Sequence, residues 1–195
     1  MTTPTPSHFK LYKPIGYLSQ FINNGPKSHK KRLLGELYDF PEGTMAIGRL
    51  DENTEGLLLL TTCGKTSATI TSGAVEKEYY CQVDGLITPE AISKLKQGVE
   101  IGFNGKRYTT LPCQVRLLNS APSFPERGKK IRDARHGPTS WISITLKEGK
   151  FRQVKKMTAA VGHPTLRLVR MRIGFQTLEN LSPGAVAFLP HPLLF

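Results

Sequence analysis

The sequence has few cysteines and no long apolar run. Its three cysteines, Cys63, Cys81 and Cys113, are far apart and form no C-x-x-C pair, which argues against a disulfide framework and against a zinc site. No stretch approaches the roughly 18 apolar residues of a membrane-spanning helix, and residues 1–9 lack the apolar segment of a secretory signal. We therefore expect a cytoplasmic protein that has no membrane partner.

Acidic residues are scarce relative to basic ones. The 195 residues include 15 Asp and Glu against 27 Lys and Arg, which gives a formal net charge of +12. Such an excess favours a polyanionic partner, and nucleic acid is the first candidate. Two stretches, residues 27–32 and 127–135, are rich in basic residues, and we expect them to be exposed loops that contact RNA phosphates.

Several common catalytic signatures are missing. The sequence has no phosphate-binding G-x-x-x-x-G-K-[ST] loop, no Rossmann glycine fingerprint and no Ser-His-Asp order. His163 has no second metal ligand at helical spacing. We therefore expect neither a metal nor a nucleotide cofactor.

The alternation of apolar patterns predicts an α/β or α+β protein with one folded unit, either one domain or two closely packed lobes. Residues 88–99 read as a helix because Thr88 can cap it and Pro89 suits its first position. The other helices are predicted over residues 65–73 and 150–162. Strands are predicted over residues 8–12, 17–21, 44–48, 56–62, 77–85, 107–118, 140–149 and 164–174.

Asp51 follows an arginine by two residues and lies at the end of a predicted strand. Alternate side chains of a strand share a face, so Arg49 and Asp51 are predicted to point into one pocket. The guanidinium would keep the carboxylate ionised, which suits a nucleophile or a base. The alternative is that Asp51 caps the following turn or forms a surface ion pair.

Tyr79 lies between Lys77 and Cys81 on one face of its predicted strand. An aromatic ring beside a cation suits the stacking of an unpaired base. The alternative is that Tyr79 is a core residue.

The predicted helix over residues 150–162 is amphipathic and basic. Arg152 and Lys155 lie on one face, beside an apolar face that contains Val154 and Met157. The basic face can contact RNA, or it can be a charged face that only meets solvent.

The string G-R-L-D-E-N-T-E-G-L-L-L-L-T-T-C-G-K, residues 48–65, resembles the catalytic signature of pseudouridine synthases, in the branch that modifies ribosomal RNA. Further motifs of that family are matched in order by residues 13–16, 77–85 and 148–174. Two other stretches, residues 18–21 and 132–149, look most like the large-subunit, E-type enzymes. Those enzymes are similar to a bare catalytic domain without an N-terminal S4 module.

The resemblance implies an α+β pseudouridine synthase catalytic fold over residues 1–195, without an S4 domain. This fold is a mixed, mainly antiparallel sheet in two lobes, with flanking helices and a central active-site cleft. The implied activity is the isomerisation of a uridine to pseudouridine in large-subunit ribosomal RNA. We expect it to need no cofactor and no metal, and to be carried out by a monomer.

The resemblance also assigns seven residues to the site: Arg49, Asp51, Tyr79, Arg152, Gln153, Lys155 and Leu168. Asp51 would be the catalytic aspartate, Tyr79 would stack on the target uracil, and Lys155 would be the cation paired with Asp51. The other four would bind the RNA or shape the surroundings of the base.

Two alternatives of other classes stay open. A non-catalytic RNA-binding or ribosome assembly protein would also explain the basic charge. A nucleoside or glycoside hydrolase usually needs two working carboxylates or a metal, and only Glu52 and Glu55 lie near Asp51 in the sequence.

Overall fold

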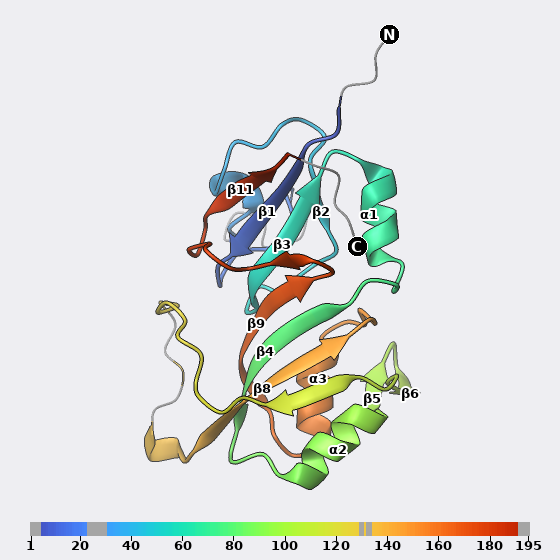
Figure 1. The fold of residues 1–195 in the computed structure, drawn as a ribbon, viewed down its shortest axis with the longest axis vertical. Helices are drawn as coiled ribbons and strands as arrows, with labels where there is room; N and C mark the ends of the chain where they lie inside the picture. Colours follow the sequence, from blue (N-terminus) through green and yellow to red (C-terminus); the bar gives the residue numbers. More distant parts are fainter. Residues whose placement is uncertain (1–4, 23–30, 129–130, 132–133, 191–195) are drawn as a thin grey trace. The chain divides into compact units, whose positions relative to one another are not determined.

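The computed structural model in Figure 1 describes residues 5–22, 31–128, 131 and 134–190. These residues divide into two compact units. The first contains the described residues up to Val75 and those from Arg172 onward, and the second is Glu76–Met171. Within the described ranges, no helix is long and apolar enough to cross a membrane.

The first unit is built on an antiparallel sheet. Strand β1 (His8–Lys13) lies between β11 (Val186–Leu189) and β3 (Glu55–Thr61), as Figure 1 shows, and β2 (Met45–Ile47) also pairs with β3. Strand β10 (Gln176–Thr177) pairs with the end of β9 (Thr165–Ile173). The helical elements are a 3-10 turn, η2 (Leu34–Glu36), and α1 (Gly64–Thr71). Phe9, Leu58 and Leu60 are buried together in the core of this unit.

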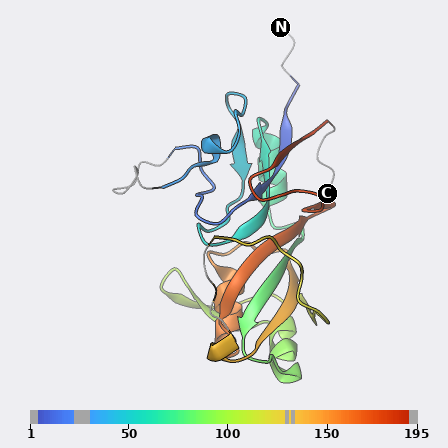
Figure 2. The same cartoon turned by 90° about the vertical axis from the view of Figure 1, so that its left-hand side faces the viewer.

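The second unit combines an antiparallel sheet with two helices. Its strands run in the order β9-β4-β8-β7, with β4 at Lys77–Asp84, β8 at Thr139–Leu146 and β7 at Gln114–Leu117. The helices are α2 (Pro89–Gln97) and α3 (Gln153–Ala160), and a 3-10 turn, η3, spans Ala134–His136. A separate hairpin of β5 (Glu100–Phe103) and β6 (Lys106–Thr109) lies beside α3 (Figures 1 and 2). This arrangement confirms the predicted α+β class.

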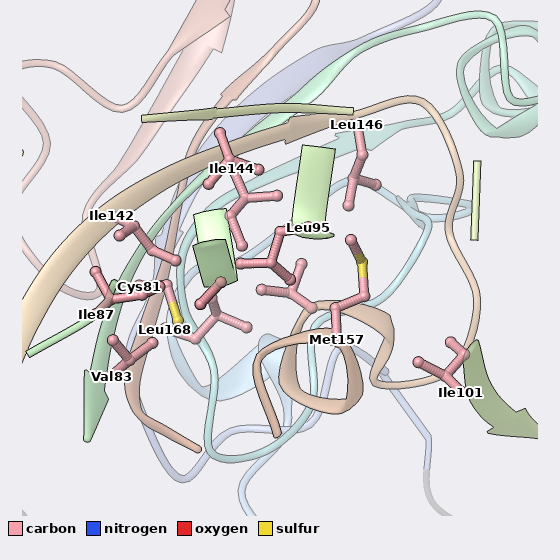
Figure 3. Close-up of a cluster of buried hydrophobic side chains, with 13 residues drawn as sticks. Cys81, Val83, Ile87, Leu95, Ile101, Ile142, Ile144, Leu146, Met157 and Leu168 are labelled. Atoms are coloured by element: carbon pink, nitrogen blue, oxygen red, sulfur yellow. The ribbon is translucent and has the colours of Figure 1, made fainter. Parts of the chain in front are cut away.

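The core of the second unit lies between one face of its sheet and the two helices. Cys81 of β4 and Ile144 of β8 are fully buried there, together with Leu95 of α2 and Met157 of α3 (Figure 3). Leu168 of β9 belongs to the same cluster. One face of the sheet and the apolar faces of both helices therefore meet in one apolar cluster, and the helical spacing of Val154 and Met157 predicted the buried face of α3.

Helix α2 begins as its sequence predicts and ends at Gln97, two residues before the end of the predicted segment. Thr88 Oγ1 accepts a hydrogen bond from the Ala91 backbone N–H (3.2 Å), and Pro89 occupies the first helical position. The residue that follows the helix is Gly98, whose φ is +101°. A Cβ on Gly98 would lie 2.2 Å from the Thr110 carbonyl oxygen.

Gly98→Ala is therefore expected to destabilise the protein by about 2 kcal/mol or more, because it adds both a backbone strain and a clash. Urea denaturation measures the loss. Gly64→Ala is the matched control, since Gly64 has nothing within 4 Å of an added Cβ and alanine favours a helix. Equal stability of the two variants would contradict this account.

His8 of β1 is buried, and its Nδ1 lies 3.0 Å from Thr61 Oγ1. Burial lowers the pKa of His8 below its ordinary value of 6.5. Just below pH 6.5 the unfolded chain then binds more protons than the folded one, so stability falls as the pH decreases. His8→Asn should flatten the dependence of Tm on pH between about pH 7 and pH 5. Thermal denaturation measures this, and equal slopes for variant and wild type would count against it.

Two predicted strands are wrong. The strand over residues 17–21 reduces to one isolated bridge between Tyr17 and Arg32. The strand over residues 107–118 is broken into β6 and β7, because Pro112 has no N–H for a sheet. The neighbouring Leu111 N–H instead donates to Glu148 Oε2 (2.8 Å).

The two basic stretches are described only in part. Of residues 27–32, the described cations are Lys31, whose Nζ lies 2.6 Å from Glu52 Oε2, and Arg32, which lies 4.0 Å from the centroid of the Tyr17 ring. Residues 27–30 and residues 129–130 and 132–133 of the second stretch lie outside the described residues. The prediction that both stretches contact RNA stays a prediction.

Candidate active site

Asp51 lies in the connection between β2 and β3 of the first unit. Leu50, the residue before Asp51, is fixed by Ser19. The Ser19 Oγ donates to Leu50 O (3.0 Å) and accepts from Leu50 N–H (2.9 Å). The turn after Asp51 is closed by a hydrogen bond from Thr54 N to Asp51 O (3.0 Å). The Asp51 side chain is partly exposed. These hydrogen bonds therefore fix the backbone on both sides of the Asp51 side chain.

The prediction that Arg49 and Asp51 share one face of a strand is wrong. Strand β2 ends at Ile47, and the next residue, Gly48, has a φ of +69°. Arg49 and Asp51 therefore lie outside a regular strand, and the rule that alternate residues share a face does not apply to them. Arg49 is exposed at the surface of the first unit.

Tyr79 lies on β4 of the second unit, on the sheet face that carries the helices. Its ring packs against the apolar cluster that contains Leu168 and is partly exposed. The Arg170 guanidinium lies 6.0 Å from the ring centroid, at the limit of a cation–π contact, and Arg170 is only 4% exposed. Tyr79 is thus an aromatic ring at the edge of the core with a buried cation beside it.

The other two residues of the predicted Tyr79 face are interior residues. Lys77 is buried, and its Nζ donates to Lys147 O (2.9 Å). Burial, and then the charge of Arg170, lower the Lys77 pKa. Burial raises the pKa of the Cys81 thiol to about 12 against the opposing effects of Thr165 and Lys155, so Cys81 is not a nucleophile. Arg170, and not Lys77, is the cation in contact with Tyr79.

Arg170 was not among the predicted site residues. The available signal was the alternation along β9, which places Leu168 and Arg170 on the same face of that strand. Which residues lie beside this face of β9 depends on the order of the strands in the sheet, and the sequence alone does not predict that order. That face carries Leu166 and Leu168 and then two arginines, Arg170 and Arg172, so the change from apolar to basic residues along it was the signal.

Helix α3 carries two of the predicted residues, Gln153 and Lys155, and a third, Arg152, directly precedes it. Lys155 lies partly exposed on the helix and near enough to Cys81 to lower the pKa of that thiol. Arg152 is exposed and precedes the helix with a left-handed backbone, φ +54° and ψ +31°. Gln153 is buried, and its amide donates to Glu148 Oε2 (2.8 Å) and accepts from Lys150 N–H (3.0 Å). Gln153 therefore fixes the turn that leads into α3.

The predicted site residues fall into two groups. Arg49 and Asp51 belong to the first unit. Five residues belong to the second unit, where Tyr79 and Leu168 share one apolar cluster and the remaining three lie on or beside α3: Arg152, Gln153 and Lys155. Among the described residues, no group of three or more His, Cys, Asp or Glu side chains is placed to hold a metal ion.

The family model for RNA pseudouridylate synthase matches residues 7–160 of the chain. A ribosomal large subunit pseudouridine synthase E from Xanthomonas axonopodis pv. citri is 40% identical over 175 residues, covering 89% of this chain and 88% of the relative. A ribosomal large subunit pseudouridine synthase B from Bacillus subtilis is 32% identical over 189 residues, covering 95% and 69% of the two chains. A solved pseudouridylate synthase structure superposes with a TM-score of 0.74 at 26% identity, covering 96% of this chain and 71% of that chain.

The match to the family model extends over most of the chain, and it includes both the connection that carries Asp51 and the strand that carries Tyr79. Sequence similarity and fold similarity agree with each other, so the chain belongs to the RNA pseudouridylate synthase family.

Proposed function

We propose that this protein converts a specific uridine of large-subunit ribosomal RNA to pseudouridine. The proposed substrate rests on the 40% identity, over nearly the whole chain, to a ribosomal large subunit pseudouridine synthase E. Identity to a ribosomal small subunit pseudouridine synthase A from Vibrio parahaemolyticus is lower, 32% over 189 residues. The net charge of +12 supports a polyanionic substrate.

The reaction rearranges bonds within one nucleotide. The bond from C1′ to N1 of uracil breaks, the base turns over, and a bond from C1′ to C5 forms; C5 loses a proton and N1 gains one. Asp51 is the proposed catalytic carboxylate, which attacks C1′, adds to the uracil ring or removes the 2′ proton. Water must be kept from the detached base, and β3, which follows Asp51 after one turn, is buried along its whole length.

Tyr79 is the proposed stacking partner of the target uracil. A uridine inside a helix must be extruded before it can react, which costs a few kcal/mol, and an aromatic face offsets part of that cost. Leu168 lies in the apolar cluster against which Tyr79 packs and supports the position of its ring. Lys155, Arg49 and Arg152 supply positive charge to the RNA.

Gln153 has an indirect role in RNA binding, because it positions the neighbouring residues that contact the RNA. Its side chain is buried and bonded to Glu148 and Lys150, so we propose that it holds the start of α3 in place. Removal of its amide would then affect Arg152 and Lys155 together.

We propose that the enzyme acts as a monomer in the cytoplasm. Its three cysteines, Cys63, Cys81 and Cys113, are all free thiols, which fits a reducing compartment. Analytical ultracentrifugation of the purified protein tests the monomer, and a stable dimer at cellular concentration would reject it.

Pseudouridine mapping tests the proposed reaction and its substrate. Large-subunit ribosomal RNA from cells without the protein should lack one pseudouridine, and purified protein should restore it. If the missing pseudouridine lies in small-subunit ribosomal RNA instead, the proposed activity stands and the proposed substrate is wrong. An unchanged map together with tight RNA binding would favour the non-catalytic assembly protein, and released uracil would indicate a hydrolase.

A further inference from the structure

The turn between β8 and α3 is held in one conformation by Glu148. The Glu148 carboxylate accepts hydrogen bonds from the Tyr108 hydroxyl, from Leu111 N–H (2.8 Å) and from the Gln153 amide (2.8 Å). Gln153 in turn accepts from Lys150 N–H (3.0 Å). Hydrogen bonds to an ionised carboxylate are stronger than neutral ones, so this set fixes both ends of the turn.

The β5–β6 hairpin braces the same turn from outside the sheet. Lys150 Nζ lies 5.3 Å from the centroid of the Phe103 ring and 5.0 Å from that of Tyr108. On α3, Lys156 Nζ donates to Gly102 O of the hairpin (2.7 Å). The hairpin, the turn and the first turn of α3 are therefore joined by several contacts.

This braced turn holds an aromatic side chain in solvent. Phe151 is 66% exposed, and in the described part of the second unit no other aromatic side chain is classed as exposed. The next residue, Arg152, has the left-handed backbone that non-glycine residues rarely adopt. Such a conformation persists where surrounding contacts enforce it, and it is found most often at functional sites.

One cation lies beside the exposed ring, and two more are adjacent to Phe151 in the chain. Lys156 Nζ lies 5.4 Å from the Phe151 ring centroid, and Lys150 and Arg152 are its chain neighbours. An exposed aromatic ring flanked by cations is the pattern by which proteins stack an unpaired base and hold the adjoining phosphates. The fixed backbone means that the ring needs no reordering when it binds.

We propose that Phe151 is a second base-stacking site for the RNA, which takes an unpaired base other than the target uridine. The site rests on the proposed function, because that function supplies a single-stranded RNA segment. Lys150, Arg152 and Lys156 attract the phosphates on either side of the stacked base. Glu148 is a positioning residue of this site, since it acts on RNA only through the turn.

Phe151→Ala should weaken binding of unmodified large-subunit ribosomal RNA by about tenfold. The slope of log affinity against log salt should not change, because no phosphate contact is removed. Phe151→Tyr keeps the ring and should bind within about twofold of wild type. Leu86→Ala is the matched control, since Leu86 is 68% exposed in the same unit and should have no effect.

A fluorescence measurement tests stacking directly. Trp141 is the single tryptophan of the chain, so Phe151→Trp in a Trp141→Phe background places one reporter at the site. A short oligouridylate should quench this tryptophan, and an abasic ribose-phosphate oligomer of equal length should not.

The outcomes separate this inference from the proposed function. If wild type forms pseudouridine but Phe151→Ala binds RNA equally well, or if the reporter is not quenched, the stacking site is overturned. If wild type forms no pseudouridine and the reporter is still quenched by bases, the stacking site stands and the proposed function fails.

Discussion

Asp51→Asn is expected to fold and to bind RNA like wild type, yet to lose pseudouridine formation by about 10³-fold or more. Asparagine has nearly the size of aspartate and keeps the backbone hydrogen bond from Thr54 N to Asp51 O. It lacks the negative charge that a nucleophile or a base requires. Tritium release from C5-labelled uridine, in single turnover with enzyme in excess, measures the rate.

Glu52→Gln is the matched control for this result. It removes the neighbouring carboxylate, which lies 2.6 Å from Lys31 Nζ in a partly exposed ion pair. Such pairs contribute about 0–1 kcal/mol, so both stability and rate should stay near wild type. If Asp51→Asn releases tritium at the wild-type rate, the Asp51 carboxylate takes no part in the chemistry. If the variant no longer unfolds cooperatively, Asp51 has a structural role.

Tyr79→Ala is expected to slow single-turnover isomerisation by about 5- to 100-fold, because stacking on an aromatic side chain contributes about 1–3 kcal/mol per base. Tyr79→Phe keeps the ring and should retain most of the rate. The same tritium release assay applies, with a melting curve for each variant. If phenylalanine fails as badly as alanine, the hydroxyl has a chemical role and stacking alone does not explain the residue.

Tyr80→Ala is the control for loss of a tyrosine from the same strand. Adjacent residues of a strand point to opposite faces, and Tyr80 contacts Phe124 (6.4 Å between ring centroids) and Arg116 (5.9 Å from its ring). Its removal should leave the rate at saturating enzyme unchanged. Equal losses for Tyr79→Ala and Tyr80→Ala would mean that the strand, and not the stacking ring, is being disturbed.

Local patterns were sufficient wherever a residue's structure depends on near neighbours in the chain. Thr88 and Pro89 predicted the start of α2 because a capping side chain reaches only two or three residues ahead. Val154 and Met157 predicted the buried face of α3 by helical spacing. The alternation in residues 77–85 predicted that Lys77, Tyr79 and Cys81 share one face of β4. In each of these cases the structure is set by residues that are close to one another in one segment of the chain.

Where the predicted structure was wrong, or a contact was not predicted, the outcome depends on residues that are distant in the chain. The strand predicted over residues 107–118 is broken at Pro112, and Glu148, more than 30 residues away, accepts the hydrogen bond of the adjacent Leu111 N–H. Arg49 and Asp51 lie outside a strand because β2 ends before Gly48. Arg170 lies beside Tyr79 because of strand order within the sheet.

The sequence by itself determined the class of fold, the amphipathic faces and the family motif that contains Asp51. Only the tertiary structure decided that Gln153 is an internal anchor, that Lys77 is buried and that Phe151 is held in solvent. The physical reason is that burial and side-chain hydrogen bonds are set by segments that approach one another from far along the chain. A periodic pattern specifies which face of a segment is apolar, and packing specifies what that face meets.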